Sequence, residues 1–315
     1  METEALETFV AVHREQGFSR AARVLNRTQP AISRRISLLE HELGAPLFER
    51  VASGIVLSQA GRVLLPYAER ALAAVKDARE AVRALRADQG GPVSLASVGT
   101  LAGTNLTEVL QRFTKTHPRV DLTLRTARSA EVSDLVRRGE VSIGLRYERD
   151  RSPDLQGESL GAEPLLVVCG PRHRLAGREV ASLQALQDER WLAFPEVPGQ
   201  REVAASHVFA LFLTRGLGEI EWTAVDSLTA QKRLVEAGLG LALMTESGVT
   251  EELSAGTLRT IGVKQLGAGA PVYLITRKGG FQSQAAQRLL ELLRTEYAAG
   301  WGHRKARGPK RPTRR

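Results

Sequence analysis

Residues 18–44, FSRAARVLNRTQPAISRRISLLEHELG, constrain the fold more than any other stretch of this 315-residue chain. The pattern predicts two short helices joined by a polar turn at Asn26 and Arg27. We expect Ser19 and Thr28 to cap the two helices, because their hydroxyls can accept hydrogen bonds from the free amides of a first turn. Two helices joined in this way form a helix-turn-helix, which makes DNA the first partner to consider.

The second helix has an apolar side and a polar side. Ile32, Ile36, Leu39 and Leu43 follow helical spacing and form the predicted buried stripe. The opposite side carries Gln29, Pro30, Ser33, Arg34, Ser37 and His41. Pro30 fits the first turn, where its missing N–H costs nothing, and Gly44 predicts the helix end. A recognition helix needs this layout, but an ordinary amphipathic surface helix shares it, so this helix alone leaves both interpretations open.

The flanking segments favour the DNA-binding interpretation. Residues 7–17 predict a preceding amphipathic helix, and residues 47–50 and 54–57 predict a short ribbon, so the whole is a winged helix-turn-helix. The chain carries the motifs L-x-x-F, G-F-S-x-A-A-x-x-L, S/T-Q-P-A-I-S-x-x-I-x-x-L-E-x-x-L-G-x-P-L-F-x-R and L-S-x-A-G. These motifs resemble those of LysR-type transcriptional regulators, densely over residues 4–65 and more loosely to about residue 298.

The resemblance implies a multidomain α/β protein that is a regulator and not an enzyme. Its expected parts are a winged helix-turn-helix, a long dimerisation linker helix and an effector domain of two α/β lobes with a periplasmic-binding-protein-like fold. The expected boundaries are 1–58 for the DNA-binding domain, 59–88 for the linker, 92–300 for the effector domain, with lobe I at 92–162 and 268–300 and lobe II at 163–267, and 301–315 for a basic disordered tail.

The positive charge of the chain is concentrated in two places. The net charge is +9, but the tail 301–315 holds seven Lys or Arg residues and no acid, which leaves only +2 for residues 1–300. Residues 14–35 contain six arginines and one acid, Glu15. The charge that suits phosphate therefore lies on the helix-turn-helix, and the tail is expected to add DNA affinity without sequence preference.

Other classes of protein fit the residues less well. The single cysteine, Cys169, excludes an intramolecular disulfide, and the scattered histidines show no metal-binding spacing, so no metal and no cofactor are expected. Gly238 and Gly240 begin a dinucleotide fingerprint but lack its third glycine. A ligand-free architectural DNA-binding protein would not need some 200 residues of α/β structure. With no signal peptide or apolar span, we expect a cytoplasmic protein without membrane contact.

Residues 59–87 predict one long helix that is capped by Ser58 and perturbed by Pro66. Leu65, Ala68, Leu72, Val75 and Val82 keep a spacing that suits a helix–helix seam, which Arg79 and Arg86 interrupt. The resemblance assigns this helix to dimerisation, and we expect a homodimer or a homotetramer.

From residue 93 onward, strands and helices alternate, which predicts parallel sheets flanked by helices. The expected strands are 93–97, 121–127, 141–147, 164–170, 191–194, 219–225, 239–244 and 271–277, and the expected helices are 100–116, 131–138, 200–215, 227–237 and 281–297. Approximate breaks at 160–163 and 266–270 separate the lobes. In such sheets a ligand binds where strands end and helices begin, and the free amides there favour anions.

A small, anionic effector is expected in that cleft. The residues that follow strands or begin helices, and that correspond to effector-contacting loops of the family, are Ser97, Thr100, Arg128, Ser129, Arg146, Gln200, Ser227 and Thr245. For each hydroxyl, simple helix capping is an equal alternative, and for each arginine so is a solvated surface position.

On promoter DNA, we expect Gln29, Pro30, Ser33 and Arg34 to face the major groove, with Gln29 on adenine, Arg34 on guanine or phosphate, and Pro30 on a thymine methyl. Arg27, Thr28 and Arg35 are expected on phosphate, with Arg50 contributing from the wing. RNA polymerase is a further expected partner. The chain departs from the family pattern at two places. The wing tip, residues 51–54, is neutral, and the usual L-D-L-A-I strand reads Val141-Ser142-Ile143-Gly144-Leu145, without the aspartate.

Overall fold

A computed structural model of the chain describes residues 1–52, 54–84, 91–195, 220–264 and 266–298. The chain divides into two compact units, each described by itself. The first comprises Met1–Asp88 with the short segments Arg137–Glu140 and Arg277–Phe281, and the second comprises the remainder. No helix in these ranges is both long enough and apolar enough to cross a membrane.

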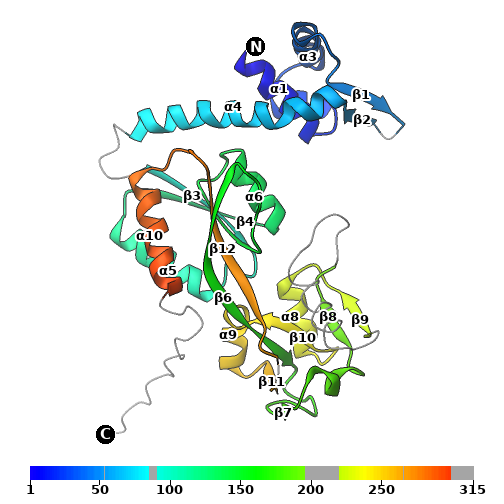
Figure 1. The fold of residues 1–315 in the computed structure, drawn as a ribbon. Helices are drawn as coiled ribbons and strands as arrows, with labels where there is room; N and C mark the ends of the chain where they lie inside the picture. The colour runs from blue at the N-terminus through cyan, green and yellow to red at the C-terminus, as the bar shows by residue number, and fades with distance from the viewer. Residues whose placement is uncertain (53, 85–90, 196–219, 265, 299–315) are drawn as a thin grey trace. The chain divides into compact units, whose positions relative to one another are not determined.

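The first unit is a winged helix-turn-helix followed by a long helix (Figure 1). Its elements are α1 (Thr3–Arg14), α2 (Phe18–Val24), α3 (Gln29–Leu43), the antiparallel strands β1 (Phe48–Val51) and β2 (Gly54–Leu57), and α4 (Gln59–Ala84). Ile32, Ile36 and Leu39 are at most 2% exposed, which confirms most of the predicted stripe, whereas Leu43 is 42% exposed at the helix end.

The helix ends follow the predictions in part. Thr28 is the N-cap residue of α3, Pro30 lies in its first turn, and Gly44 ends it in the left-handed conformation at φ 69°. Ser19 was expected to cap α2, but that helix begins one residue earlier, at Phe18, with Gly17 at its N-cap. Because Ser19 is then inside the helix, its hydroxyl does not take the capping position. Neither α2 nor α3 has a side-chain cap hydrogen bond.

Helix α4 is capped as expected, since the amide of Gly61 donates to Ser58 Oγ at 3.0 Å, and it runs through Pro66 as one element. Part of the predicted seam faces its own unit. Leu65 and Leu72 pack with Ala68 against the core of their own unit. Val82 of the predicted seam is exposed, and it continues an exposed apolar stripe of α4 whose other members are Val63, Tyr67, Ala71, Ala74 and Ala78.

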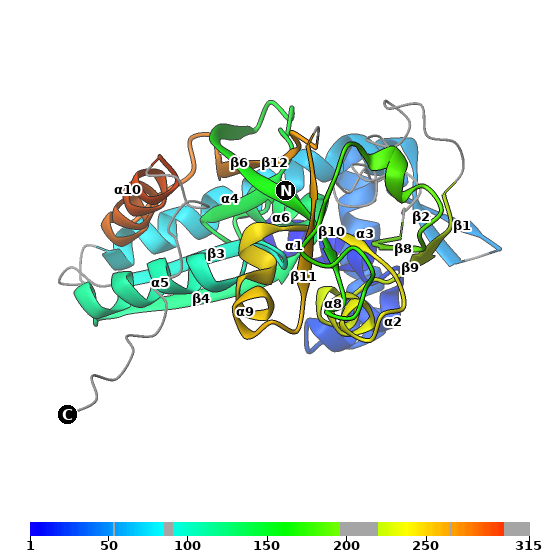
Figure 2. The same cartoon turned by 90° about the horizontal axis from the view of Figure 1, so that it is seen from below.

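The second unit contains two α/β lobes (Figures 1 and 2). Its elements are β3 (Gly91–Val98), α5 (Thr104–Thr116), β4 (Val120–Ala127), α6 (Ser129–Arg137), β5 (Ile143–Tyr147), β6 (Leu155–Cys169), β7 (Glu179–Val180), the 3-10 helix η1 (Leu183–Leu186), β8 (Trp191–Ala193), β9 (Trp222–Ala224), α8 (Leu228–Glu236), β10 (Ala242–Thr245), α9 (Glu246–Ala255), β11 (Arg259–Val263), β12 (Gly269–Arg277) and α10 (Gln284–Ala298).

The sheets are mixed, although the sequence predicted parallel ones. Within the described residues, the main sheet has the order β4-β3-β5-β12-β6-β11-β7, and β10 also pairs with β6. Strand β3 is parallel to β4 and β5, whereas β12 is antiparallel to β5, and β10 and β11 are antiparallel to β6. The antiparallel pairing of β12 with β5 arises because the chain returns to the first lobe through β12. Helices α5 and α10 lie side by side against β3 (Figure 2).

Three further predictions need correction or lie outside the described residues. The expected break at 160–163 is part of β6, which runs unbroken from Leu155 to Cys169. Helix α9 and strand β11 were not predicted at all. The helix expected at 200–215, the first residue of the strand expected at 219–225 and the tail 301–315 lie outside the described residues.

Candidate DNA interface and inter-lobe cleft

Helix α3 presents a polar side to solvent. Gln29, Pro30 and Arg34 are exposed there, Ser33 is half-buried, and Arg27 and Thr28 are exposed just before the helix. The opposite side is held in the core by the stripe at Ile32 to Leu39, so the exposed side has a fixed orientation within its unit. The N-terminal turn of such a helix also carries free amides and partial positive charge, which favour phosphate.

The remaining predicted DNA contacts differ in how they are held. Arg35 pairs with Glu4 of α1 at 2.6 Å, which ties its side chain to its own unit. Arg50 is exposed on β1, where its backbone pairs with Ile55. The described part of the wing tip contains Val51 and Ala52 and carries no charge, so Arg50 is the cation of the described wing.

A cleft of about 670 Å³ lies between the lobes of the second unit. Strand ends and helix starts from both lobes form it, as the sequence predicted. Its lining residues are Val98, Gly99, Thr100, Ala102, Thr126, Ala127, Arg128, Ser129, Glu131, Tyr147, Phe194, Asp226, Ser227, Leu228 and Thr229. Four of the eight predicted effector contacts are among them: Thr100, Arg128, Ser129 and Ser227.

The polar groups of the cleft carry both signs of charge. Arg128 precedes α6 and is exposed, whereas Glu131 and Asp226 contribute carboxylates from the two lobes. Helices α6 and α8 both begin at the cleft, so each presents first-turn amides toward it. The Ser227 hydroxyl accepts from the amide of Ala230 at 3.4 Å and is the N-cap of α8. The cleft therefore combines one arginine and two helix starts with two carboxylates.

Arg146 and Ser97, which were predicted as effector contacts, do not line this cleft. Arg146 is 8% exposed, and its guanidinium donates to Asp150 at 2.7 Å and to the hydroxyl of Ser133. Burial opposes ionisation of Asp150, but hydrogen bonds from Ser133 and Ser152 and the charge of Arg146 hold its pKa at about 2. Ser97 is fully buried and donates to the carbonyl of Val98 at 3.2 Å. Gln200 lies outside the described residues.

A smaller cavity of about 30 Å³, which we call the annex, shares Thr100, Tyr147, Phe194 and Leu228 with the cleft. The rest of its lining is Leu165, Gln231, Leu243, Met244, Thr245 and Ala270. Thr245, the remaining predicted effector contact, is therefore on the annex and not on the main cleft. The annex has a more apolar lining than the main cleft.

Sequence reasoning missed a buried polar network beside the annex. Glu163 of β6 is 4% exposed; its Oε1 accepts from Ser247 at 2.9 Å, and its Oε2 accepts from the Tyr147 hydroxyl at 3.5 Å. Thr100 Oγ1 in turn donates to Tyr147 at 3.0 Å. The local sequence does not indicate that Glu163 is buried. The residue precedes Pro164 in a segment whose sequence predicts an exposed break between the lobes.

Burial dominates the chemistry of this network. Burial raises the pKa of Glu163 to about 7, and the negative charge of Glu246 adds to this rise. Hydrogen bonds from Ser247, Thr245 and Tyr147 lower the pKa but do not cancel the effect of burial. Burial also raises the pKa of Tyr147, as does the nearby Glu163 charge. In the described part of the chain, Glu163 makes no ion pair. Its carboxyl is therefore neutral or ionised depending on pH near neutrality.

Both units match known family models. Residues 3–62 match the model described as "Bacterial regulatory helix-turn-helix protein, lysR family", and residues 86–298 match "LysR substrate binding domain". The chain belongs to the LysR family of transcriptional regulators. It is thus a helix-turn-helix DNA-binding regulator with an effector-binding domain, and not an enzyme.

Individual relatives resemble this LysR-family regulator over most of its length. It is 31% identical to the HTH-type transcriptional regulator CfxR of Cupriavidus necator over 271 residues, which covers 85% of this chain and 81% of the relative. It is 27% identical to a RuBisCO operon transcriptional regulator of Allochromatium vinosum over 293 residues, covering 93% and 95%. Among solved structures, full-length CbnR complexed with its target DNA is similar at 26% identity and a TM-score of 0.62, covering 94% of this chain and 99% of that one.

Proposed function

We propose that this regulator binds a specific promoter site through α3 and that a small acidic effector in the inter-lobe cleft controls the binding. The observation that carries the effector half is the convergence of Arg128 with the first turns of α6 and α8 on one cleft of about 670 Å³. Such amides and an arginine bind a carboxylate or another anion. The carboxylates of Glu131 and Asp226 disfavour a ligand with several negative charges, so one acidic group with additional donors fits best.

On DNA, Gln29 and Arg34 would read base edges, since both are exposed on α3 and both suit bidentate contacts. Pro30 would touch a thymine methyl, and Ser33 would add a hydrogen bond. Arg27, Thr28, Arg35 and Arg50 would hold phosphates and fix the position of the helix. The solved complex of CbnR with its target DNA supports this use of the helix-turn-helix unit.

The exposed stripe of α4 would pair with the same stripe of a second copy. Val63 and Tyr67 are 61% and 60% exposed, and the small residues Ala71, Ala74 and Ala78 would let two helices approach closely. A homodimer formed in this way, or a tetramer of two such dimers, would present two α3 helices to paired half-sites. Action on transcription would take place in the cytoplasm and involve RNA polymerase.

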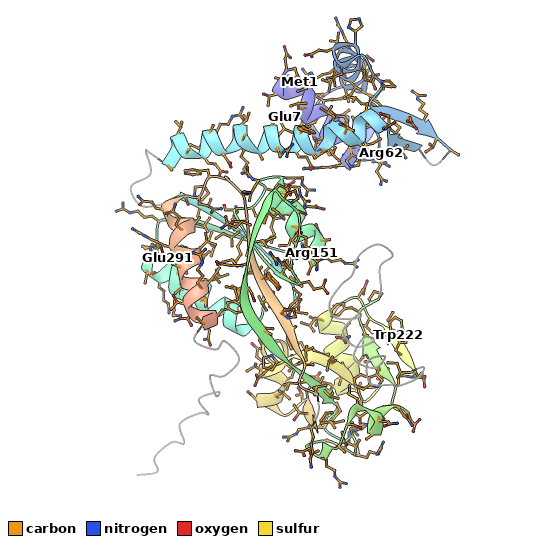
Figure 3. The ribbon with its side chains drawn as sticks, viewed as in Figure 1. Met1, Glu7, Arg62, Arg151, Trp222 and Glu291 are labelled. Carbon is orange, nitrogen blue, oxygen red and sulfur yellow. The ribbon has the colours of Figure 1, made fainter. Side chains whose placement is uncertain are left out.

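A genomic footprint of the purified full-length protein, with and without candidate metabolites, tests the proposal. We expect a small set of protected promoters, among them that of a neighbouring or divergently transcribed gene, and a change in the protected region with the effector. The matched variants are Arg128→Ala in the cleft and Arg151→Ala as a control, because Arg151 is exposed and does not line the cleft (Figure 3). Protection spread at random over the genome would overturn the DNA half, and an unchanged response in Arg128→Ala would overturn the anion site.

A further inference from the structure

Glu163 connects the two lobes of the second unit through its carboxyl group. The residue lies on β6, two positions before this strand begins to pair with β10 of the second lobe at Leu165. One carboxyl oxygen accepts from Ser247 at the start of α9, in the second lobe, and the other accepts from Tyr147 at the end of β5, in the first lobe. The hydroxyl of Thr245 also forms a hydrogen bond with the carboxyl. Hydroxyl groups from both lobes thus meet on one side chain, and we call these residues, Glu163, Tyr147, Thr245 and Ser247, the joint.

The two lobes lie in close contact at the joint. A Cβ atom at Gly103, the residue before α5 of the first lobe, would lie 3.2 Å from the backbone oxygen of Ser247 in the second lobe. All four residues of the joint are between 4% and 7% exposed. In its closed state the joint therefore keeps bulk water away from the carboxyl of Glu163.

No described cation balances the ionised form of Glu163. The titratable groups that interact with its carboxyl are Tyr147, Tyr297 of α10 and Glu246 of α9, and none of these carries a positive charge. Helix α5 and strand β12 each approach the joint with a glycine, which has no side-chain charge. A buried carboxylate without a cation is costly. Accordingly, burial outweighs the hydroxyl donors and raises the pKa of Glu163 to about 7.

The effector cleft adjoins the joint. Tyr147 and Thr245 both line the annex, and Tyr147 also lines the main cleft. A small separation of the lobes at Ser247 would let solvent from the cleft reach the carboxyl of Glu163. Because hydration favours the charged form of a carboxyl, the ionised form favours the separated state and the neutral form favours the closed state.

We propose that the joint is controlled by a proton on Glu163: the neutral carboxyl keeps the lobes closed at this point, and the ionised carboxylate loosens them by admitting water. Tyr147 belongs both to the joint and to the wall of the main cleft. The shape of the cleft therefore changes with the ionisation of a residue that does not line it. The joint requires no ligand, so its test does not depend on the identity of the effector.

Hydrogen–deuterium exchange of the full-length protein, without ligand, tests the joint. Peptides that cover residues 158–169 and 245–252 are followed at about pH 5.5 and about pH 8.5, with labelling times scaled to the same intrinsic exchange. Between these two conditions, we expect their protection to fall by about tenfold to a hundredfold, because opening releases a proton that the closed joint retains. At each pH they should also exchange faster than a peptide from β3, a strand of the same unit outside the joint.

Glu163→Gln stays neutral, so its two joint peptides should keep at high pH the protection that the wild type shows at low pH. Glu158→Gln is the matched control and should respond as the wild type does, since Glu158 lies on the same strand but pairs with Arg294 at 2.6 Å. Should Glu163→Gln fail to fold, Ser247→Ala removes a hydroxyl that lowers the pKa of Glu163, so the loss of protection should begin at higher pH.

Two kinds of result overturn the proton-controlled joint. The first is a pH response of the wild type that Glu163→Gln shares, or the absence of any response in the wild type. The second is exchange of the joint peptides at the same rate as the peptide from β3, because the whole unit would then unfold together.

Discussion

The Ser247 hydroxyl donates a 2.9 Å hydrogen bond to Oε1 of Glu163, although the two residues lie 84 positions apart in the chain. The bond joins β6 to the first turn of α9, and Tyr147 contacts the other oxygen of the same carboxyl. The Glu163 carboxyl is thus held by two hydroxyl groups, and the residue is 4% exposed. Because folding shifts the pKa of this carboxyl, the stability of the folded protein depends on whether the carboxyl is ionised.

Glu163→Gln should change how stability depends on pH. The folded pKa of about 7 exceeds the ordinary value of 4.5, so the folded state holds a proton there that the unfolded state releases. The stability from this proton is fully present below about pH 4.5 and is lost as the pH rises through 7. The side chain of the variant stays neutral at every pH. Between pH 5 and pH 8, the free energy of unfolding should therefore fall by up to about 3 kcal/mol more in the wild type than in the variant.

Urea denaturation followed by the fluorescence of the buried Trp191 measures this effect. Glu291→Gln is the control, since Glu291 is exposed on α10 (Figure 3). Parallel pH curves for wild type and Glu163→Gln would show that the carboxyl does not change its proton in this range.

Arg146→Ala should act first on stability. The change leaves Asp150, whose folded pKa is about 2, as a partly buried carboxylate without its guanidinium partner. Removal of one member of a buried pair costs about 3–5 kcal/mol, and the partial exposure of this pair places the expected loss at or below the lower end. Thermal unfolding measures the loss. Arg146→Ala protein of wild-type stability and weakened effector binding would instead assign the residue to the cleft.

Leu39→Ala should destabilise the first unit by about 2–5 kcal/mol, because Leu39 is only 1% exposed and its truncation leaves a cavity. The neighbouring Leu38 is 60% exposed on the same helix, so Leu38→Ala is a control of identical chemistry. Circular dichroism melting curves and promoter binding should both separate the two variants. Equal melting of the two would mean that α3 is not anchored through Leu39.

Arg34→Ala should cost promoter binding about 1–3 kcal/mol and relax the preference at one base pair. Arg35→Ala should weaken binding to all sequences by a smaller amount and reduce its salt dependence, since Arg35 is expected on phosphate and is shared with Glu4. Gel-shift titrations on the promoter and on single-base variants, at two salt concentrations, distinguish the two. Loss of affinity without loss of discrimination in Arg34→Ala would place that residue on phosphate.

Ala74→Glu should dissociate the proposed dimer, because it places a charge in the middle of the small-residue stripe of α4. Arg83→Glu is the control, since Arg83 is exposed on the same helix but outside the stripe. Sedimentation velocity at matched concentrations reads the result. An unchanged sedimentation coefficient for Ala74→Glu would locate the association elsewhere.

The sequence predicted best where local chemistry decides the structure. Gly44 and Pro30 mark the ends of α3, and the stripe at Ile32, Ile36 and Leu39 marks its buried side. The predicted seam on α4 is covered in part by its own unit, because helical spacing identifies an apolar side without saying which surface covers it. Leu65 and Leu72 meet the three-helix core of their own unit instead.

The missed features depend on partners far away in the chain. Helix α9 contains Ser247 and Gly248 near its start and has a weak apolar pattern, so it reads as a loop. Residues 157–163 of β6 include two glycines and two glutamates and read as a break, yet they belong to one strand that neighbours β12 in the sheet. The burial of Glu163 likewise follows only from its three-dimensional neighbours.

The continuity of β6 has a mechanical consequence for the second unit. Strands β6 and β12 are neighbours in one sheet, and each carries the chain between the lobes without a loop. Hydrogen-bonded strands resist sliding past one another but accept changes in twist. We therefore expect the lobes to change their relative angle by twisting these two strands, and not by movement of a loop. The twist costs energy, so the lobes should return to their original angle when the cause of the change is removed.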